Sequence, residues 1–222
     1  MQDAPLDLSR FTAAIFDMDG TMIENMSYHK KACQEFFRRH GVHLGDDEFQ
    51  QKISGKKNDE ICELVFGRHV HDDELNGYAA EKEALYRELY RGEIKEVDGL
   101  TTFVDTLQAR GVKTAIATTA PKDNREFVLA SLDLNGKFEV ILGDEHVVNG
   151  KPHPEIYLET ARQLGVDPAD CVVFEDSPPG VQAGKAAGMS VVGLLTSHVA
   201  GELAGIDYTI RDFTELMEGI RD

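Results

Sequence analysis

From residue 97 onward, short apolar runs alternate with longer segments in which apolar residues recur at helical spacing. Short runs bounded by glycine, proline and polar residues are typical of buried strands, and the longer amphipathic segments are typical of helices. One apolar run near the start of the chain has the same character as the later runs. We therefore expect strands at Ala13–Phe16, Lys113–Thr118, Val140–Leu142, Cys171–Phe174, Ser190–Leu194 and Tyr208–Ile210, and helices near Leu100–Arg110, Asn124–Leu132, Glu155–Leu164, Gly180–Ala187 and Phe213–Glu218.

Residues 24–96 have a different texture and contain no convincing strand pattern. Their periodicity predicts helices from an N-cap at Ser27 to about His40, over Asp59–Phe66 and over Glu74–Tyr90. Because the first strand belongs with the later ones, this helical segment is an insertion after strand one. We expect an α/β core formed by residues 1–23 and 97–222, and a helical cap domain formed by residues 24–96, joined through hinges near 24–26 and 96–99.

Strands that alternate with helices are joined by right-handed crossovers, and this pattern predicts a parallel-sheet, Rossmann-like core. In such a sheet, ligands bind outside the carboxyl ends of the strands. The residues that directly follow each strand are therefore the first candidates for a functional site.

Asp17 and Asp19 follow the first strand, and strand alternation is expected to place them on the same side. Two carboxylates held together repel each other unless a cation lies between them. Such a pair suits Mg²⁺ binding, nucleophilic attack and proton transfer. The alternative for this motif alone is a strand followed by an acidic turn.

Three later strands are also followed by polar side chains. The hydroxyls and backbone N–H groups of Thr118 and Thr119 suit a phosphate oxygen. Lys151 lies next to Pro152, in a loop that the prolines stiffen. Glu175 and Asp176 form a second acidic pair. Each piece is weak by itself, but together they are hard to explain as packing.

The charge of the chain limits its partners. Its 23 Lys and Arg against 40 Asp and Glu give a formal net charge of −17. Nucleic acids and anionic membranes require basic patches, so neither is an expected partner. If the substrate is anionic, a bound metal or a few placed lysines must supply positive charge locally.

Cysteine usage and hydropathy indicate the compartment. Cys33, Cys62 and Cys171 are far apart and form no C-x-x-C motif, which favours buried thiols in a reducing compartment. The chain shows no leader pattern at its start and no run of about 18 apolar residues. We expect a cytoplasmic protein that is a monomer or a weak dimer.

The strand-end motifs resemble those of the haloacid dehalogenase superfamily. Asp-Met-Asp-Gly-Thr at 17–21, Thr118, Lys151 and the pair Glu175-Asp176 match its four motifs in order and at sensible spacing. The stretches Gly-Lys-Pro-His-Pro-Glu-Ile-Tyr and Val-Phe-Glu-Asp-Ser-Pro-Pro-Gly are similar to the β-phosphoglucomutase-like branch, which carries a helical cap directly after the first motif.

The resemblance implies a role for each core motif. Asp17 would be the nucleophile that forms an aspartyl phosphate, and Asp19 the general acid and then the base that activates water. Thr118 and Lys151 would hold the phosphoryl oxygens. Together with the second acidic pair, these residues argue against a dehalogenase, which has no use for all of them.

The resemblance also implies a Mg²⁺ site. Its ligands would be the side chains of Asp17 and Asp176 and the backbone carbonyl of Asp19, with Glu175 binding directly or through water. Mg²⁺ prefers a few carboxylates together with waters and phosphate, which agrees with this set.

Substrate choice is expected to depend on the cap. His29 matches a position where the mutase has a histidine that faces the active site, although a surface or capping histidine is an equal alternative. The mutase has an arginine three residues after a cap-loop glycine, and that arginine grips the non-transferring phosphate. This chain has Asn58 there, preceded by Lys56 and Lys57.

We therefore expect a Mg²⁺-dependent phosphatase that acts on a small phosphorylated metabolite, with a sugar phosphate as the expected class. The alternative is β-phosphoglucomutase, which uses the same phospho-enzyme. A non-catalytic regulatory protein is the third reading, and the intact motif side chains argue against it.

Overall fold

Six parallel strands form the centre of this computed structural model, which describes residues 6–43, 45 and 58–217. The strand order is β3-β2-β1-β4-β5-β6, and every neighbouring pair is parallel. The α/β class with a parallel sheet is thus confirmed. The strands are β1 (Ala13–Phe16), β2 (Lys113–Ala117), β3 (Val140–Leu142), β4 (Cys171–Glu175), β5 (Ser190–Leu194) and β6 (Tyr208–Ile210).

The chain divides into two compact units, which are described separately. The core unit comprises Met1–Glu24 and Ile94–Asp222, and the helical unit comprises Asn25–Glu93. The helical unit is therefore inserted between β1 and the remaining strands.

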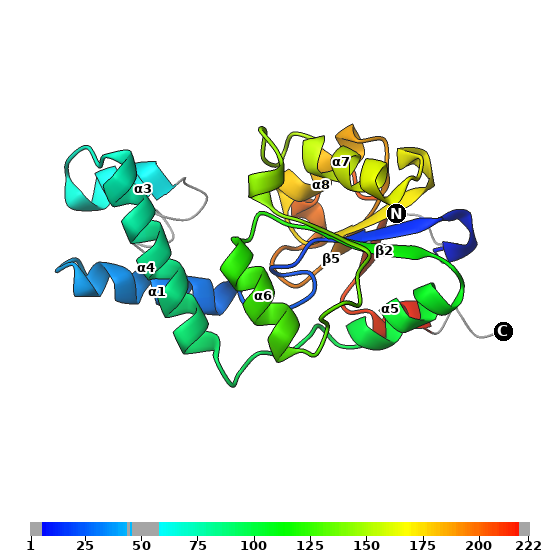
Figure 1. Cartoon of the computed structure of the whole chain (residues 1–222), viewed down its shortest axis with the longest axis horizontal. Coiled ribbons are helices and arrows are strands. Elements are labelled where there is room, and N and C mark those ends of the chain that lie inside the picture. Colours follow the sequence, from blue (N-terminus) through cyan, green and yellow to red (C-terminus); the bar gives the residue numbers. More distant parts are fainter. Residues whose placement is uncertain (1–5, 44, 46–57, 218–222) are drawn as a thin grey trace. The chain divides into compact units, whose positions relative to one another are not determined.

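Helices cover both faces of the sheet in the core unit (Figure 1). Helices α7 (Glu155–Leu164) and α8 (Pro178–Ala186) cover one face, and α5 (Leu100–Ala109) and α6 (Lys122–Ser131) lie on the other. Every residue of β1 and β4 is buried. This burial explains why the strands are continuous apolar runs, because a parallel sheet covered on both faces leaves no polar face.

Four phenylalanine rings form the packing between the sheet and α5. Phe16 of β1 stacks on Phe174 of β4 at 4.8 Å between ring centroids. Phe103 of α5 contacts Phe174 at 5.4 Å and stacks on Phe213 at 5.5 Å. Phe213 lies just before the short helix α9 (Thr214–Met217), so this cluster also fixes the end of the described chain.

The helical unit contains α1 (Met26–Arg39), α3 (Asn58–Phe66) and α4 (Asp72–Tyr90). Helices α1 and α4 pack together through aromatic rings, among them Tyr28 and Tyr90 with centroids 4.4 Å apart. The prediction that Ser27 caps α1 is wrong, because the helix begins at Met26 and the capping position falls on Asn25. Asn25 is fully buried, and its amide donates to the Tyr86 hydroxyl at 2.7 Å, so tertiary packing sets this end of the helix.

The order of the strands reverses between β1 and β4. From β1 the chain builds outward through β2 and β3, and it then crosses over to β4 and continues in the other direction. In open α/β sheets, the crevice outside the carboxyl ends of the strands at such a switch point is where ligands bind. Residues 17–20 and 175–177 lie at this point.

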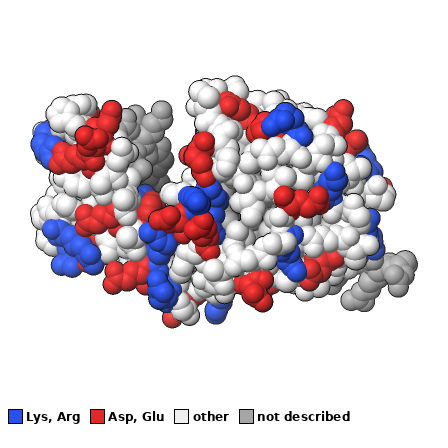
Figure 2. Space-filling model, in the orientation of Figure 1, with Lys and Arg blue, Asp and Glu red and all other residues white. Residues whose placement is uncertain are grey.

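The surface carries charges of both signs. On the face drawn in Figure 2, acidic and basic side chains are interspersed over both units. No helix among residues 6–43 and 58–217 is both long and apolar enough to cross a membrane.

Replacing the buried Phe103 by alanine should lower the free energy of unfolding by about 3–5 kcal/mol, because the side chain is fully buried and leaves a cavity. Leu158→Ala on α7 is the control, since Leu158 is 40% exposed and its loss should change stability by less than about 1 kcal/mol. Urea unfolding followed by circular dichroism measures both variants. Equal losses would show that the aromatic cluster does not hold α5 on the sheet.

Candidate active site

Asp17 lies directly after β1, in a tight turn at the switch point. Strand β1 ends at Phe16, and the backbone N–H of Asp17 donates to the Phe174 carbonyl at 3.0 Å, which fixes it beside β4. Strand alternation therefore does not set the two carboxylates, because Asp17 and Asp19 both lie beyond the strand. Asp17 is 7% exposed, whereas Asp19 is only partly buried.

The turn requires glycine at position 20. Gly20 has φ +80°, and a Cβ there would lie 2.0 Å from Oδ2 of Asp176. Any side chain would strain the backbone and collide with a site carboxylate. The backbone after β1 thus approaches Asp176 closely.

The Lys151 ammonium group lies between carboxylates from two strand ends. Its Nζ is 2.6 Å from Oδ1 of Asp17 and 2.6 Å from Oε1 of Glu175, and it donates to the Ala117 carbonyl at 3.1 Å. The side chain is 6% exposed. Burial alone would lower the pKa of Lys151, but Asp17 and Glu175 raise it well above its ordinary value, so the lysine is charged.

Glu175 is fully buried and uses both of its oxygens. Oε1 accepts from Lys151 and from the Tyr157 hydroxyl, the latter at 2.8 Å. Oε2 accepts from the Ser177 hydroxyl at 3.0 Å and from the backbone N–H groups of residues 176 and 177, both at 3.1 Å. Gly180 permits this arrangement, because a Cβ there would lie 1.7 Å from Oε1 of Glu175. Glu175 is therefore held chiefly as the partner of Lys151.

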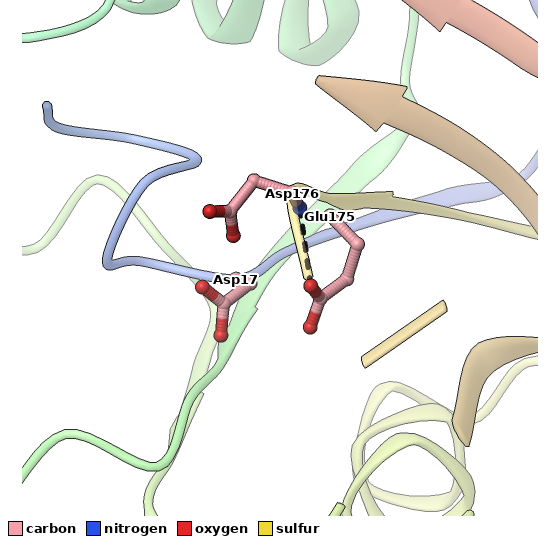
Figure 3. A group of neighbouring side chains, drawn as sticks. All are labelled: Asp17, Glu175 and Asp176. Carbon is pink, nitrogen blue, oxygen red and sulfur yellow. Dashed lines mark hydrogen bonds between the residues drawn. The ribbon is translucent and has the colours of Figure 1, made fainter. Parts of the chain in front are cut away.

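Asp17, Glu175 and Asp176 are all buried, and each offers a ligand oxygen within 4.8 Å of the others. Figure 3 shows their carboxylates around one small space, with Asp17 from the end of β1 and the other two from the end of β4. The three carboxylates outnumber the Lys151 ammonium, which pairs with two of them. Burial, followed by the Glu175 charge, raises the pKa of Asp176 to about 6. Buried oxygen ligands with excess negative charge fit a hard divalent cation such as Mg²⁺.

The structure brings together Asp17, Lys151, Glu175 and Asp176, and Thr118 directly follows β2. Thr118 is buried, and its Oγ1 accepts from the Ala120 N–H at 3.1 Å. Lys151 contacts the carbonyl of Ala117, the residue before Thr118. Thr119 is exposed, so the two neighbouring hydroxyls have different surroundings.

Residues 196–198, which follow β5, also bind the groups of the site and were not predicted from the sequence. After β5, the Thr196 hydroxyl donates to the Gly20 carbonyl, and the Ser197 hydroxyl hydrogen-bonds the Asp176 side chain. Nδ1 of His198 lies 3.0 Å from the Asp176 carbonyl oxygen and must donate to it, because a carbonyl can only accept. The signal was available, since these polar residues follow a predicted strand as the other candidates do.

Of the candidate substrate-binding residues in the helical unit, the structure describes His29 and Asn58. The His29 ring stacks on Tyr86 with centroids 4.0 Å apart, and its Nε2 lies 3.2 Å from the Asn25 amide nitrogen. Lys56 and Lys57 lie outside the described residues, and Asn58 is placed as the first residue of α3.

Comparison with known proteins places these features in a family. The family model described as "Hydrolase: haloacid dehalogenase-like hydrolase" matches residues 11–188. The validoxylamine A 7'-phosphate phosphatase of Streptomyces hygroscopicus subsp. limoneus is 32% identical over 211 residues, covering 93% of this chain and 96% of that protein. The fructose-1-phosphate phosphatase of Escherichia coli (strain K12) is 31% identical, covering 82% and 96%.

A solved structure agrees with these matches. The crystal structure of a putative β-phosphoglucomutase from Thermotoga maritima superposes with a TM-score of 0.78 at 27% identity, covering 95% of this chain and 100% of that one. The likeness therefore includes both units.

Asp176→Ala should weaken Mg²⁺ binding by at least about tenfold, since even outer partners of metal ligands contribute that much. Calorimetric titration of the substrate-free protein with Mg²⁺ measures the affinity. Asp105→Ala is the control, because Asp105 is an exposed carboxylate on α5 that pairs with Lys137. If Asp176→Ala binds Mg²⁺ as tightly as Asp105→Ala does, Asp176 is not a ligand.

Proposed function

This chain belongs to the family of haloacid dehalogenase-like hydrolases, and on that premise we propose that it is a Mg²⁺-dependent phosphatase of a small phosphorylated metabolite. The observation that carries the proposal is the buried cluster in which Lys151 holds Asp17 at the switch point of the sheet. The named phosphatases among its relatives support the same activity. A sugar phosphate is the proposed substrate class, because one of these relatives is named for fructose 1-phosphate.

Asp17 is the proposed nucleophile. Lys151 binds its Oδ1, so we assign the attack on phosphorus to Oδ2. The O–P bond of the aspartyl phosphate forms as the bond from phosphorus to the substrate oxygen breaks. Lys151 also offsets the charge repulsion between the carboxylate and an incoming phosphate.

Asp19 is the proposed acid and base. In the first step it donates a proton to the leaving alcohol oxygen. In the second step it takes a proton from a water molecule, whose oxygen attacks the phosphorus of the aspartyl phosphate and releases inorganic phosphate and free Asp17. Its partly exposed position in the turn after β1 suits exchange with water.

Thr118 and Lys151 are the proposed ligands of the phosphoryl oxygens. The Thr118 oxygen accepts from Ala120, so its own proton is available to an oxygen of the phosphoryl group. Asp17 and Asp176 would hold Mg²⁺ with the Asp19 carbonyl, and Glu175 would contribute directly or through water. When bound, Mg²⁺ supplies positive charge to the phosphoryl oxygens.

The proposed nucleophile is tested by Asp17→Asn in a colorimetric phosphate-release screen over a panel of phosphorylated metabolites with Mg²⁺. Wild-type protein should release phosphate from one or more phosphate monoesters, and the variant should lose at least about a thousandfold in rate. The variant should still fold, because Glu175 remains the charged partner of Lys151 and an amide oxygen at position 17 can still accept from the lysine. Asp105→Asn is the exposed control. Activity of Asp17→Asn within tenfold of wild type would reject the assignment.

β-Phosphoglucomutase activity is the second candidate, favoured by the structural likeness to the Thermotoga maritima protein. A mutase must re-engage a bisphosphate before water reaches the aspartyl phosphate, which requires a firm grip on the distal phosphate. Arginine provides a bidentate fork for this purpose, lysine provides only a point charge, and Asn58 provides neither. We therefore place hydrolysis first.

Hydrolysis should outpace isomerisation of β-glucose 1-phosphate. A coupled assay for glucose 6-phosphate, run with catalytic bisphosphate, measures isomerisation, and inorganic phosphate is measured in the same samples. Asn58→Arg restores the fork and should raise isomerisation relative to hydrolysis. Wild-type isomerisation about a hundredfold faster than phosphate release would identify the chain as a mutase.

A further inference from the structure

The guanidinium group of Arg125 is buried between two loops at the carboxyl edge of the sheet. Arg125 lies in the first turns of α6, and its side chain is 6% exposed. Nη1 donates to the Ala120 carbonyl at 2.6 Å and to Oε2 of Glu145 at 3.1 Å, and Nη2 pairs with the other oxygen of Glu145. Ala120 follows β2 and Glu145 follows β3, so a single side chain ties the two loops together.

The carbonyl that Arg125 holds belongs to the loop of Thr118. The Ala120 N–H donates to Oγ1 of Thr118 at 3.1 Å, while the Ala120 carbonyl accepts from Arg125. The residue is thus fixed from both sides. Movement of Ala120 would release the bond that orients the Thr118 hydroxyl.

The backbone of the second loop packs against the guanidinium. A Cβ on Gly143 would lie 1.8 Å from Nη1 of Arg125 and 2.5 Å from Cζ, so a side chain at that position would displace it. Glycine at position 143 and arginine at position 125 are therefore matched.

Stability alone is a poor reason for this arrangement. Burying a guanidinium costs desolvation energy, and an apolar side chain of similar volume is often equally or more stabilising. Glu145 is 46% exposed, so its attraction for Arg125 is partly screened by solvent. The presence of arginine at this position is better explained by its planar guanidinium, which binds the Ala120 carbonyl and the Glu145 carboxylate at the same time.

We propose that Arg125 is a positioning residue that sets the phosphate affinity of the Thr118–Ala120 loop. The proposal rests on the proposed function, because it takes this loop to bind the transferring phosphoryl group. Arg125 acts through Ala120 and does not itself contact phosphate. A lysine would keep the positive charge but would reach only one of the two acceptors.

Arg125→Met and Arg125→Lys test the proposal through calorimetric binding of inorganic phosphate in saturating Mg²⁺. Phosphate affinity should fall about tenfold or more in Arg125→Met, the loss expected for a broken bond to a charged group. In Arg125→Lys the phosphate affinity should fall less, by about threefold, because the lysine retains one donor group. In the hydrolysis assay, kcat/KM should fall with phosphate affinity, whereas Mg²⁺ affinity without phosphate should stay at the wild-type value.

Lys185→Met is the matched control. In the same unit, Lys185 of α8 forms an ion pair at 2.7 Å with Asp207, in the segment that leads to β6. Both side chains are about one-third exposed. Its loss should lower the urea midpoint without changing phosphate affinity. If Arg125 had only a structural role, Arg125→Met would likewise lower the urea midpoint and leave phosphate affinity unchanged.

Wild-type phosphate affinity in folded Arg125→Met would overturn the proposal. If Arg125→Met does not fold, Arg125→Lys and Glu145→Gln decide, since both keep the volume of the pair while weakening it. Unchanged phosphate affinity in both would overturn the positioning role, and a loss in both would support it. Failure of the proposed function is distinct, because wild-type protein would then neither bind phosphate in Mg²⁺ nor hydrolyse any monoester, and the positioning role would fall with it.

Discussion

The burial of one ammonium group among three carboxylates is the constraint on which the core unit depends. Lys151 is almost inaccessible to solvent, and an unpaired charge in that environment would be very costly. Asp17 and Glu175 come from the ends of β1 and β4, and these two strands are neighbours in the sheet. The parallel pairing of β1 with β4 therefore provides the lysine with both partners.

The pairing of Lys151 also places demands on the backbone around its partners. The Tyr157 hydroxyl and the backbone N–H groups of residues 176 and 177, just before α8, hold the two oxygens of Glu175 in place for Lys151. That close approach requires glycine at position 180, just as the proximity of Asp176 requires glycine at position 20. The motif glycines and the motif charges thus belong to one arrangement, in which small residues let the backbone reach the carboxylates.

Much of the core unit was predictable because a single physical rule connects sequence and structure. Covered parallel strands must be apolar throughout, so β1 and β4 are visible as apolar runs, and polar residues at their ends mark the ligand edge. The partners of those residues were harder to predict. Tyr157 and Arg125 lie on helices with ordinary amphipathic patterns, and only the folded chain shows what their polar atoms reach.

In the helical unit, the sequence predicted the helices but not where the first one begins. The periodicity of apolar residues located α1 and α4, but the start of α1 is set by the burial of Asn25 against Tyr86, which no local pattern specifies. Ser27 carries a typical capping side chain and is nevertheless inside the helix. Long-range packing overrides local capping preference at this position, and the boundary between the units falls at the same residue.

The turn after β1 gives two identical side chains different surroundings. Asp17 lies in the buried cluster against Lys151, where its carboxylate is oriented and burial raises its pKa while the lysine opposes that rise. Asp19, two residues later and past the fully buried Met18, is partly open to solvent. A group that attacks phosphorus benefits from fixed geometry, whereas a group that exchanges protons with water benefits from access to it. Enzymes commonly separate the roles of paired carboxylates in this manner, by environment rather than by chemistry. The surroundings that the turn gives Asp17 and Asp19 therefore support the proposed division of labour between them.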